Sequence, residues 1–373
     1  MKIIVGGGIS GLWLAAELKA RNIPCCVIEK NALGQGQTLA SQGMIHGGTK
    51  YALDGRLSKA ANEISTMPAR WKQALKGNGR VDLRAVQLER EDQLLWSVGS
   101  VAANLMGFFA SKAMRARMER IDPRTEAAFN YPRFKGHLYR LSEPVLRLDT
   151  LIKAFAELLD GQLFHAEVTG FITRDGNVVG VETSVGQMLG DVIMTAGEGT
   201  EPLLSTLNGQ LPQMQLRPLA MGVCKLARPI PRVFGHQLGG GTKPKLSVST
   251  HEVAGAQYLY LGGQLAEDGV SLDDDHLRHR AVCAVSEALR WLEPTIETTR
   301  IFRVNRAEPS TNAGNRPDTA FVTKCNNLIV AWPTKLALAP ALADQILPML
   351  EINSSRFRQP QWPVAPQGTY PWV

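Results

Sequence analysis

The first thirty residues combine two apolar runs with one amphipathic stretch between them. Residues Lys2–Val5 and Cys25–Glu29 are short and mostly apolar, which predicts two buried strands. Residues 10–20 place apolar side chains at helical spacing and carry Glu17 and Lys19 as charged positions. The pattern predicts a strand–helix–strand unit whose strands lie parallel in one sheet, because a crossover helix connects parallel strands.

The rest of the chain continues to alternate between helical and strand patterns. We predict helices over residues 57–76, 100–120, 149–159 with Asp149 as N-cap, 273–292, and 335–350 with Pro340 in its first turns. We predict strands over residues 145–148, several within 163–190 around an Asp175-Gly176 turn, and others over 191–196, 215–250, 257–262 and 327–331. The Pro-rich residues 359–373 are expected to be irregular and to lie on the surface. The alternation predicts an α/β protein.

Length and charge narrow the classes of protein. The chain has 373 residues, enough for two domains, and its 44% hydrophobic and 20% charged residues are typical of globular proteins. The net charge of +7 suits an anionic cofactor or substrate, an anionic membrane surface, or simply a mixed basic surface. Basic residues form no run of five or more, which argues against nucleic-acid binding.

The cysteines and the hydropathy pattern bear on the compartment. There are five cysteines, at Cys25, Cys26, Cys224, Cys283 and Cys325. Their number is odd and their spacing is not that of metal ligands, so we expect no metal site and interpret all five as core thiols in a reducing compartment. Glycines and charges interrupt the first apolar stretch, which argues against a signal peptide, and no transmembrane helix is expected. We therefore expect a cytoplasmic protein, and peripheral membrane contact stays open.

Three glycines and one glutamate in the first unit indicate a dinucleotide site. Gly6, Gly8 and Gly11 follow the first strand and open the helix, the context in which G-x-G-x-x-G is informative. Gly6 permits a tight turn, Gly8 lets the backbone approach a pyrophosphate, and Gly11 allows close helix–strand packing. Glu29 ends the second strand, where its carboxylate can accept hydrogen bonds from ribose hydroxyls. Ile9, Ser10 and Lys30 flank these residues and are assigned to the same site.

The glycine motif alone does not separate FAD from NAD, but three later segments resemble one flavoprotein family. They are residues 40–48, reading Ala-Ser-Gln-Gly-Met-Ile-His-Gly-Gly; the strand ending in Thr195-Ala196-Gly197; and residues 260–264, reading Tyr-Leu-Gly-Gly-Gln. With the N-terminal motif, they make the chain similar to the D-amino-acid oxidase-type family of FAD-dependent oxidoreductases. That family includes glycine and sarcosine oxidases and glycerol-3-phosphate and L-2-hydroxyglutarate dehydrogenases.

The resemblance implies FAD as cofactor and a two-dinucleotide-binding, Rossmann-like FAD domain. It implies a second, substrate domain built on a mixed or antiparallel sheet. We expect residues 1–75, 145–205 and 317–355 in the FAD domain, residues 76–144 and 206–316 in the substrate domain, and residues 356–373 as a C-terminal tail.

The resemblance also assigns roles to further residues at the cofactor. Ser41, Gln42 and Gly43 are expected along the pyrophosphate and the flavin edge, and Met44 to Gly47 beside the flavin ring. The backbone of Val168 is expected at the adenine, and Ala196 and Gly197 at the second cofactor-contacting strand. The family's Gly-rich turn after the last strand is replaced here by residues 332–336, which contain no glycine. Amides of Thr334, Lys335 and Leu336, together with the Lys335 charge, remain candidates for stabilising negative charge on the flavin.

Three kinds of side chain are candidates on the substrate side: arginine, histidine and tyrosine. Arg306 occupies a place similar to the carboxylate-binding arginine of amine-oxidising members, although the family's Arg-Pro is Arg306-Ala307 here. A guanidinium fork matches a carboxylate, and an ordinary structural or surface arginine is the alternative. Arg303 is the alternative, and Arg217 a further candidate cation. His46 is a candidate hydrogen-bonding partner, proton acceptor or covalent flavin attachment point. Tyr258 and Tyr260 share one side of a strand and are candidates for lining the substrate cavity, with packing as the alternative.

These residues favour an enzyme that takes a hydride from the α-carbon of a small anionic carboxylate. An amino acid or secondary amine is the first candidate substrate; a 2-hydroxy acid or glycerol 3-phosphate is the alternative. Oxygen or a quinone is the expected electron acceptor. A non-catalytic or nucleic-acid-modifying flavoprotein and an NAD-dependent dehydrogenase are the hypotheses from other classes.

Overall fold

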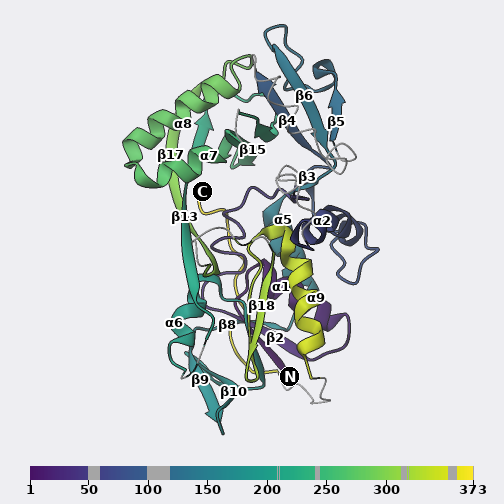
Figure 1. Cartoon of the computed structure of the whole chain (residues 1–373), viewed down its shortest axis with the longest axis vertical. Coiled ribbons are helices and arrows are strands. Elements are labelled where there is room, and N and C mark those ends of the chain that lie inside the picture. The colour runs from purple at the N-terminus through teal and green to yellow at the C-terminus, as the bar shows by residue number, and fades with distance from the viewer. Residues whose placement is uncertain are drawn as a thin grey trace.

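Two large sheets form the framework of the molecule. The computed structural model describes residues 1–48, 59–98, 118–207, 209, 211–239, 244–311, 317, 319–351 and 359–372. A six-stranded sheet lies in one half and an eight-stranded sheet in the other, and the long strands β13 and β17 run along one side of the molecule (Figure 1). The predicted α/β class is confirmed.

The six-stranded sheet has the order β18-β19-β12-β1-β2-β8. Its strands are β1 (Lys2–Val5), β2 (Cys25–Glu29), β8 (Leu163–His165), β12 (Asp191–Met194), β18 (Phe321–Cys325) and β19 (Leu328–Trp332). All neighbours pair in parallel except β18, which is antiparallel to β19. The predicted first strands are therefore confirmed, and the parallel strands end at a common edge, where α/β proteins bind ligands.

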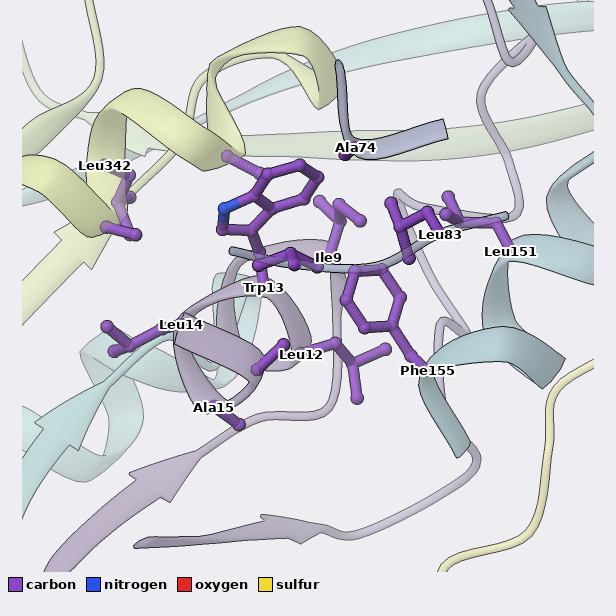
Figure 2. Close-up of a cluster of buried hydrophobic side chains, with 14 of the residues drawn as sticks. Ile9, Leu12, Trp13, Leu14, Ala15, Ala74, Leu83, Leu151, Phe155 and Leu342 are labelled. Carbon is purple, nitrogen blue, oxygen red and sulfur yellow. The ribbon is translucent and has the colours of Figure 1, made fainter. Parts of the chain in front are cut away.

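Among the described residues, four helices cover this sheet, and α1 is buried between the sheet and the other three. They are α1 (Ile9–Lys19), α2 (Lys59–Leu75), α5 (Leu148–Leu158) and α9 (Ala339–Ile346). Trp13 of α1 lies 4.7 Å from the ring of Trp71 and 6.2 Å from that of Phe155, between centroids. Figure 2 shows this ring among apolar side chains from α1, α5 and α9. Because neighbours surround it, α1 is apolar nearly all round.

The eight-stranded sheet has one apolar and one partly polar face. Its order is β17-β13-β16-β15-β14-β4-β6-β5. The bounds are β4 (Gln93–Val98), β5 (Met118–Ile121), β6 (Gly136–Leu141), β13 (Met214–Leu226), β14 (Phe234–Gln237), β15 (Leu246–Val253), β16 (Ala256–Gly262) and β17 (Ile296–Pro309). On β15, Leu246 and Val248 join the apolar core beneath α8 (Asp274–Ala288), whereas Ser247, Ser249 and His251 point the other way and are still buried. A buried polar face indicates that another part of the chain covers it.

Smaller elements complete the chain. They are β3 (Leu88–Arg90) and β7 (Val145–Leu146), which pair; β9 (Val168–Arg174), β10 (Asn177–Thr183) and β11 (Gly186–Leu189), which form a three-stranded sheet; and the short helices α6 (Thr200–Leu204) and α7 (Gln264–Asp268). The predicted Asp175-Gly176 hairpin turn is confirmed, with φ values of 49° and 74°. No helix among the described residues has the length and apolarity to cross a membrane.

Three helix predictions need correction. Arg147, not Asp149, is the N-cap of α5, and Asp149 lies in its first turn, where a carboxylate stabilises the helix dipole. Residues 118–120 belong to strand β5 because they pair with β6; residues 99–117 of that predicted helix lie outside the described residues. The last predicted helix is three pieces, a 3₁₀ turn Leu336–Leu338, α9, and a 3₁₀ turn Leu347–Met349, since Pro348 interrupts the hydrogen bonding.

The Pro-rich tail and two cysteines also differ from expectation. The described tail is irregular, but Ala365 and Trp372 are buried, and the tail forms bridges to Leu33 and Phe164. Its apolar side chains therefore contribute to the core instead of only covering the surface. The thiols at positions 25, 26 and 224 are buried, whereas Cys283 is exposed and Cys325 is partly exposed.

Candidate active site

The three glycines of the N-terminal motif meet three different steric demands. Gly6 has a φ of 107°, and a Cβ there would lie 2.7 Å from the Cα of Ala196. A Cβ on Gly11 would lie 2.1 Å from the carbonyl oxygen of Gly6. A Cβ on Gly8 would meet only the Thr38 hydroxyl, at 3.6 Å. The backbone of Gly8 is therefore open on that side, as close approach of a phosphate requires.

The start of α1 and the end of β2 lie beside this turn. The N-cap residue of α1 is Gly8, which has no side chain to cap the helix. The amide of Ile9 donates to the Thr38 hydroxyl at 3.0 Å. The Glu29 carboxylate accepts from the amides of Gly7, at 2.7 Å, and Asn31, at 2.8 Å. The glutamate predicted for the ribose thus lies against the glycine turn, with the exposed Lys30 after it.

A second loop, residues Thr195 to Gly197, closes the other side of the turn. The Thr195 hydroxyl lies 3.1 Å from the carbonyl oxygen of Val5 and 3.2 Å from that of Gly6. Gly197 has a φ of 57°, and its carbonyl accepts from the Trp332 indole at 3.5 Å. The ends of β1, β12 and β19 are therefore joined at one edge of the sheet.

The turn without glycine adopts a conformation that glycine usually provides. Thr334 has a φ of 60°, and the Lys335 amide donates to the Pro333 carbonyl at 2.7 Å, closing a three-residue turn. The Thr334 hydroxyl donates to the carbonyl of Thr319 at 3.1 Å. The Lys335 amide is thus used within the turn, and a contact between the Lys335 side-chain charge and the flavin stays a prediction. Leu336 follows at the start of a 3₁₀ turn, not of an α-helix.

The segment from Ser41 to Gly47 runs antiparallel to residues 143–146. The Leu146 amide donates to the Gly43 carbonyl at 2.9 Å, and the Ile45 amide donates to the Pro144 carbonyl at 3.0 Å. Gly43 has a φ of 70°, and a Cβ there would lie 2.3 Å from the Leu146 carbonyl oxygen. Met44 bridges Val145. The backbone of this segment is therefore held in place by residues 143–146.

The same segment is attached to the eight-stranded sheet through Gln42 and Tyr260. The Gln42 side-chain Nε2 donates to the Tyr260 carbonyl at 2.9 Å, and the Tyr260 hydroxyl donates to the Ala40 carbonyl at 2.8 Å. Tyr260 is fully buried, and burial raises the pKa of its phenol. The expectation that Tyr260 lines the substrate cavity as a catalytic group is therefore corrected: its hydroxyl holds the segment in place.

His46 lies between a buried carboxylate and a second histidine. Its Nδ1 is 3.7 Å from Glu143 Oε2, its ring centroid is 5.2 Å from that of His236, and its side chain is 45% exposed. Burial, and to a smaller extent His46, lowers the pKa of His236 to about 3. Sequence reasoning identified His46 but missed Glu143 and His236, since neither lies in a motif; a glutamate before a proline gave no usable signal.

The register of β17 against β13 separates the candidate arginines. Arg306 lies opposite Arg217, so both share the face that carries Val304 and Phe302, whereas Arg303 points to the other face. Arg303 donates to Asp274 and to the carbonyl of Leu272, each at 2.8 Å, on the side of α8. These contacts remove Arg303 as the alternative substrate anchor.

Arg217 and Arg306 differ in their ion pairs. The Arg217 guanidinium donates twice to the buried Glu308 carboxylate, at 2.6 and 3.0 Å. Arg306 makes a longer contact of 3.8 Å with Glu267 and donates from Nε to the Arg217 carbonyl at 3.4 Å. The charge of Arg217 is thus closely neutralised by Glu308, whereas Arg306 lies beside Glu267 on the same face.

This fold and this glycine turn define a dinucleotide-binding α/β protein with a second, mixed-sheet unit. The family model for FAD dependent oxidoreductases, DAO, matches residues 2–345, and the chain belongs to this family. Its relatives include the probable FAD-dependent oxidoreductase PA4991 of Pseudomonas aeruginosa, 39% identical over 99% of this chain and 96% of that protein. Glycine oxidase of Pseudomonas putida is 27% identical over 64% of this chain and 70% of its own length.

Solved structures agree with this assignment. The PA4991 structure has a TM-score of 0.86 at 35% identity and covers 100% of this chain and 96% of its own. Glycine oxidase from Geobacillus kaustophilus has the same fold, with a TM-score of 0.65 at 16% identity over 97% of both chains. The protein is therefore an FAD-dependent oxidoreductase, and the choice between FAD and NAD is decided in favour of FAD.

Proposed function

We propose that the protein removes a hydride from the α-carbon of a small carboxylate, with an amino acid or a secondary amine as first candidate. The observation that carries this proposal is the position of Arg306 on the partly polar face of the eight-stranded sheet. Gln42 attaches residues 41–47, the predicted flavin-contacting segment, to that same face. Relatives of the same fold are named glycine oxidase and iminodiacetate oxidase, after compounds that carry an amine and a carboxylate.

The residues at the strand ends fit FAD. The open side of Gly8 and the start of α1 suit a pyrophosphate, and Glu29 suits a ribose. We propose that the cofactor is held by residues at the strand ends and the loops beside them: Gly6, Gly8, Ile9, Ser10, Gly11, Glu29, Lys30, Ser41, Gln42, Gly43, Met44, Val168, Ala196, Gly197, Thr334, Lys335 and Leu336. Bound FAD supplies the hydride acceptor, and the protein supplies binding and orientation.

We assign the substrate carboxylate to Arg306. Its guanidinium can make two parallel hydrogen bonds to a carboxylate and so fix the α-carbon in one orientation. The side chain is 15% exposed, which strengthens such a charge-assisted bond relative to one in open water. Arg217 contributes indirectly, because its carbonyl accepts from Arg306 Nε while its own charge is paired with Glu308.

A 2-hydroxy acid is the second candidate, and the contact between His46 and Glu143 favours it. A hydroxyl must lose its proton as the hydride leaves, so an imidazole beside the flavin segment has a direct use. Glycerol 3-phosphate is less well matched, because a guanidinium beside Glu267 is a weaker site for a dianion. Oxygen or a quinone is the proposed electron acceptor.

The positions of the two sheets along the chain support the proposed domain division. All strands of the six-stranded sheet fall within residues 1–75, 145–205 and 317–355, and all strands of the eight-stranded sheet fall within 76–144 and 206–316. We propose these segments as the FAD and substrate domains.

An anaerobic absorbance titration tests the function. The purified holoenzyme is mixed with amino acids, N-methyl amino acids, 2-hydroxy acids and glycerol 3-phosphate, and the flavin band near about 450 nm is followed. Bleaching by an amine or a hydroxy acid, but not by its decarboxylated analogue, supports the proposal and names the class. Bleaching by compounds without a carboxylate would contradict the role given to Arg306.

A further inference from the structure

A buried carboxylate lies beside the one histidine of the flavin-contacting segment. Glu143 is 1% exposed, and its Oε1 accepts from the Gly47 amide at 2.8 Å. Its Oε2 accepts no hydrogen bond from the described residues and lies 3.7 Å from His46 Nδ1. A buried carboxylate oxygen without a partner is costly, so this atom is expected to gain one. Hydrogen bonds in active sites are often long without substrate and shorten when it binds.

The backbone fixes both partners relative to each other. The Ile45 amide donates to the Pro144 carbonyl, and the Leu146 amide donates to the Gly43 carbonyl, so the two segments form a short antiparallel pair. Glu143 directly precedes this pair on one segment and His46 directly follows it on the other, so the pairing fixes where both side chains begin. Side chains on such elements are held more accurately than side chains on single loops.

The other described neighbours of His46 are uncharged groups. The His236 ring is fully buried between Ser247 Oγ, at 2.7 Å, and Gln93 Oε1, at 3.3 Å. Burial keeps His236 neutral, and Gln93 is neutral and donates to the Ile45 carbonyl at 3.5 Å. Among the described residues around His46, Glu143 is thus the anionic partner.

We propose that Glu143 is a positioning residue that accepts a hydrogen bond from His46 Nδ1 and leaves the Nε2 lone pair free to take a proton. The proton comes from the substrate heteroatom on the α-carbon. With FAD bound as the hydride acceptor, the α-hydrogen would leave with its electron pair, the heteroatom would form a double bond to that carbon, and its N–H or O–H proton would pass to His46 Nε2. The substrate part of this inference rests on the proposed function, whereas the tautomer of His46 does not.

The variant Glu143→Gln tests the inference. The carboxamide oxygen still accepts from the Gly47 amide, but its NH₂ group now donates towards His46 Nδ1 and selects the other tautomer. We expect kcat to fall by at least about 100-fold, the size of a general-base contribution, with KM and FAD content little changed. Glu17→Gln is the matched control, because it removes a buried carboxylate on α1 that pairs with Arg21 and Arg70. It should leave kcat unchanged.

Nitrogen-15 NMR of histidine-labelled holoenzyme gives a readout that needs no substrate. The signal that disappears in His46→Gln belongs to His46; it should show a protonated Nδ1 in the native enzyme and a protonated Nε2 in Glu143→Gln. The same tautomer in both proteins, or an unchanged kcat, would overturn the role of Glu143. Flavin that remains attached to the denatured native chain but not to His46→Gln would overturn it too, because a covalent His46 cannot act as a base. If no tested compound reduces the flavin while the tautomer changes as expected, only the proposed substrate class fails.

Discussion

Trp372 stacks on Tyr260, with ring centroids 4.2 Å apart and ring planes inclined by 26°. The tryptophan comes from the Pro-rich tail, and the tyrosine is the residue whose hydroxyl holds Ala40. The tail therefore packs on the same face of the eight-stranded sheet to which residues Ala40 and Gln42 are attached. Trp372 is part of the apolar cluster on this face.

Trp372→Ala should lower the free energy of unfolding by about 3 kcal/mol, because it removes a buried ring from a cluster with Met221 and Val223. Urea denaturation followed by tyrosine and flavin fluorescence measures the change. Trp362→Ala, at a half-buried position of the same tail, is the control and should cost clearly less. Equal losses for both variants would mean that Trp372 is not part of the core.

Tyr260→Phe should leave kcat unchanged and lower stability by about 1 kcal/mol. The change leaves the ring stacking intact and removes one buried hydrogen bond, to the Ala40 carbonyl. Steady-state kinetics and urea denaturation separate the two effects. If turnover instead slowed by about 10-fold or more while stability stayed the same, Tyr260 would be restored as a catalytic group, since a 10-fold change in rate corresponds to about 1.4 kcal/mol.

Arg306→Ala should raise KM for a carboxylate substrate by about 10- to 100-fold, the loss of a charge-assisted hydrogen bond worth roughly 1.5–3 kcal/mol. Arg303→Ala is the control on the same strand, since its side chain contacts Asp274 on the opposite face. It should leave KM as it is. If KM changed only in the Arg303 variant, the substrate would bind on the face opposite to the one that we propose.

Gly8→Val and Gly11→Ala should fail in different ways. A side chain at Gly8 has space in the protein itself, so this variant should fold but lose FAD. A Cβ at Gly11 collides with the Gly6 carbonyl, so this variant should lose stability even without the cofactor. The ratio of absorbance at about 450 and about 280 nm, with thermal unfolding of the FAD-free proteins, separates these outcomes. Stoichiometric FAD in the Gly8 variant would show that the pyrophosphate lies elsewhere.

Stability should fall as the pH is lowered from about 6.5 towards 3. Burial lowers the pKa of His236 from 6.5 to about 3 and that of His251 to about 4, so between these values the unfolded chain binds protons that the folded protein does not. The native state is then disfavoured by a few kcal/mol near the lower end of this pH range. Above about pH 6.5 the two histidines are neutral in both the folded and the unfolded chain, so the effect vanishes. His236→Gln should make urea-derived stability less dependent on pH in this range. An unchanged pH dependence would mean that this ring is not buried as described.

Local pattern alone predicted the strand–helix–strand unit and its glycine turn. The bounds of β1 and β2 and the start of α1 agree with prediction within one residue. Consecutive residues carry this information, because hydrophobic period and backbone sterics act over a few positions. The four resembling segments likewise indicated the FAD-dependent family before any contact was known.

Contacts between distant segments depended on the tertiary structure. Glu143 reaches Gly47 across 96 positions, and its neighbours in the sequence give no sign of it. The choice between Arg303 and Arg306 required the register of β17 on β13, because neighbouring odd and even positions face opposite sides of a strand. Residue type and spacing thus determined the cofactor turn, whereas register and packing decided which side chains meet beside it.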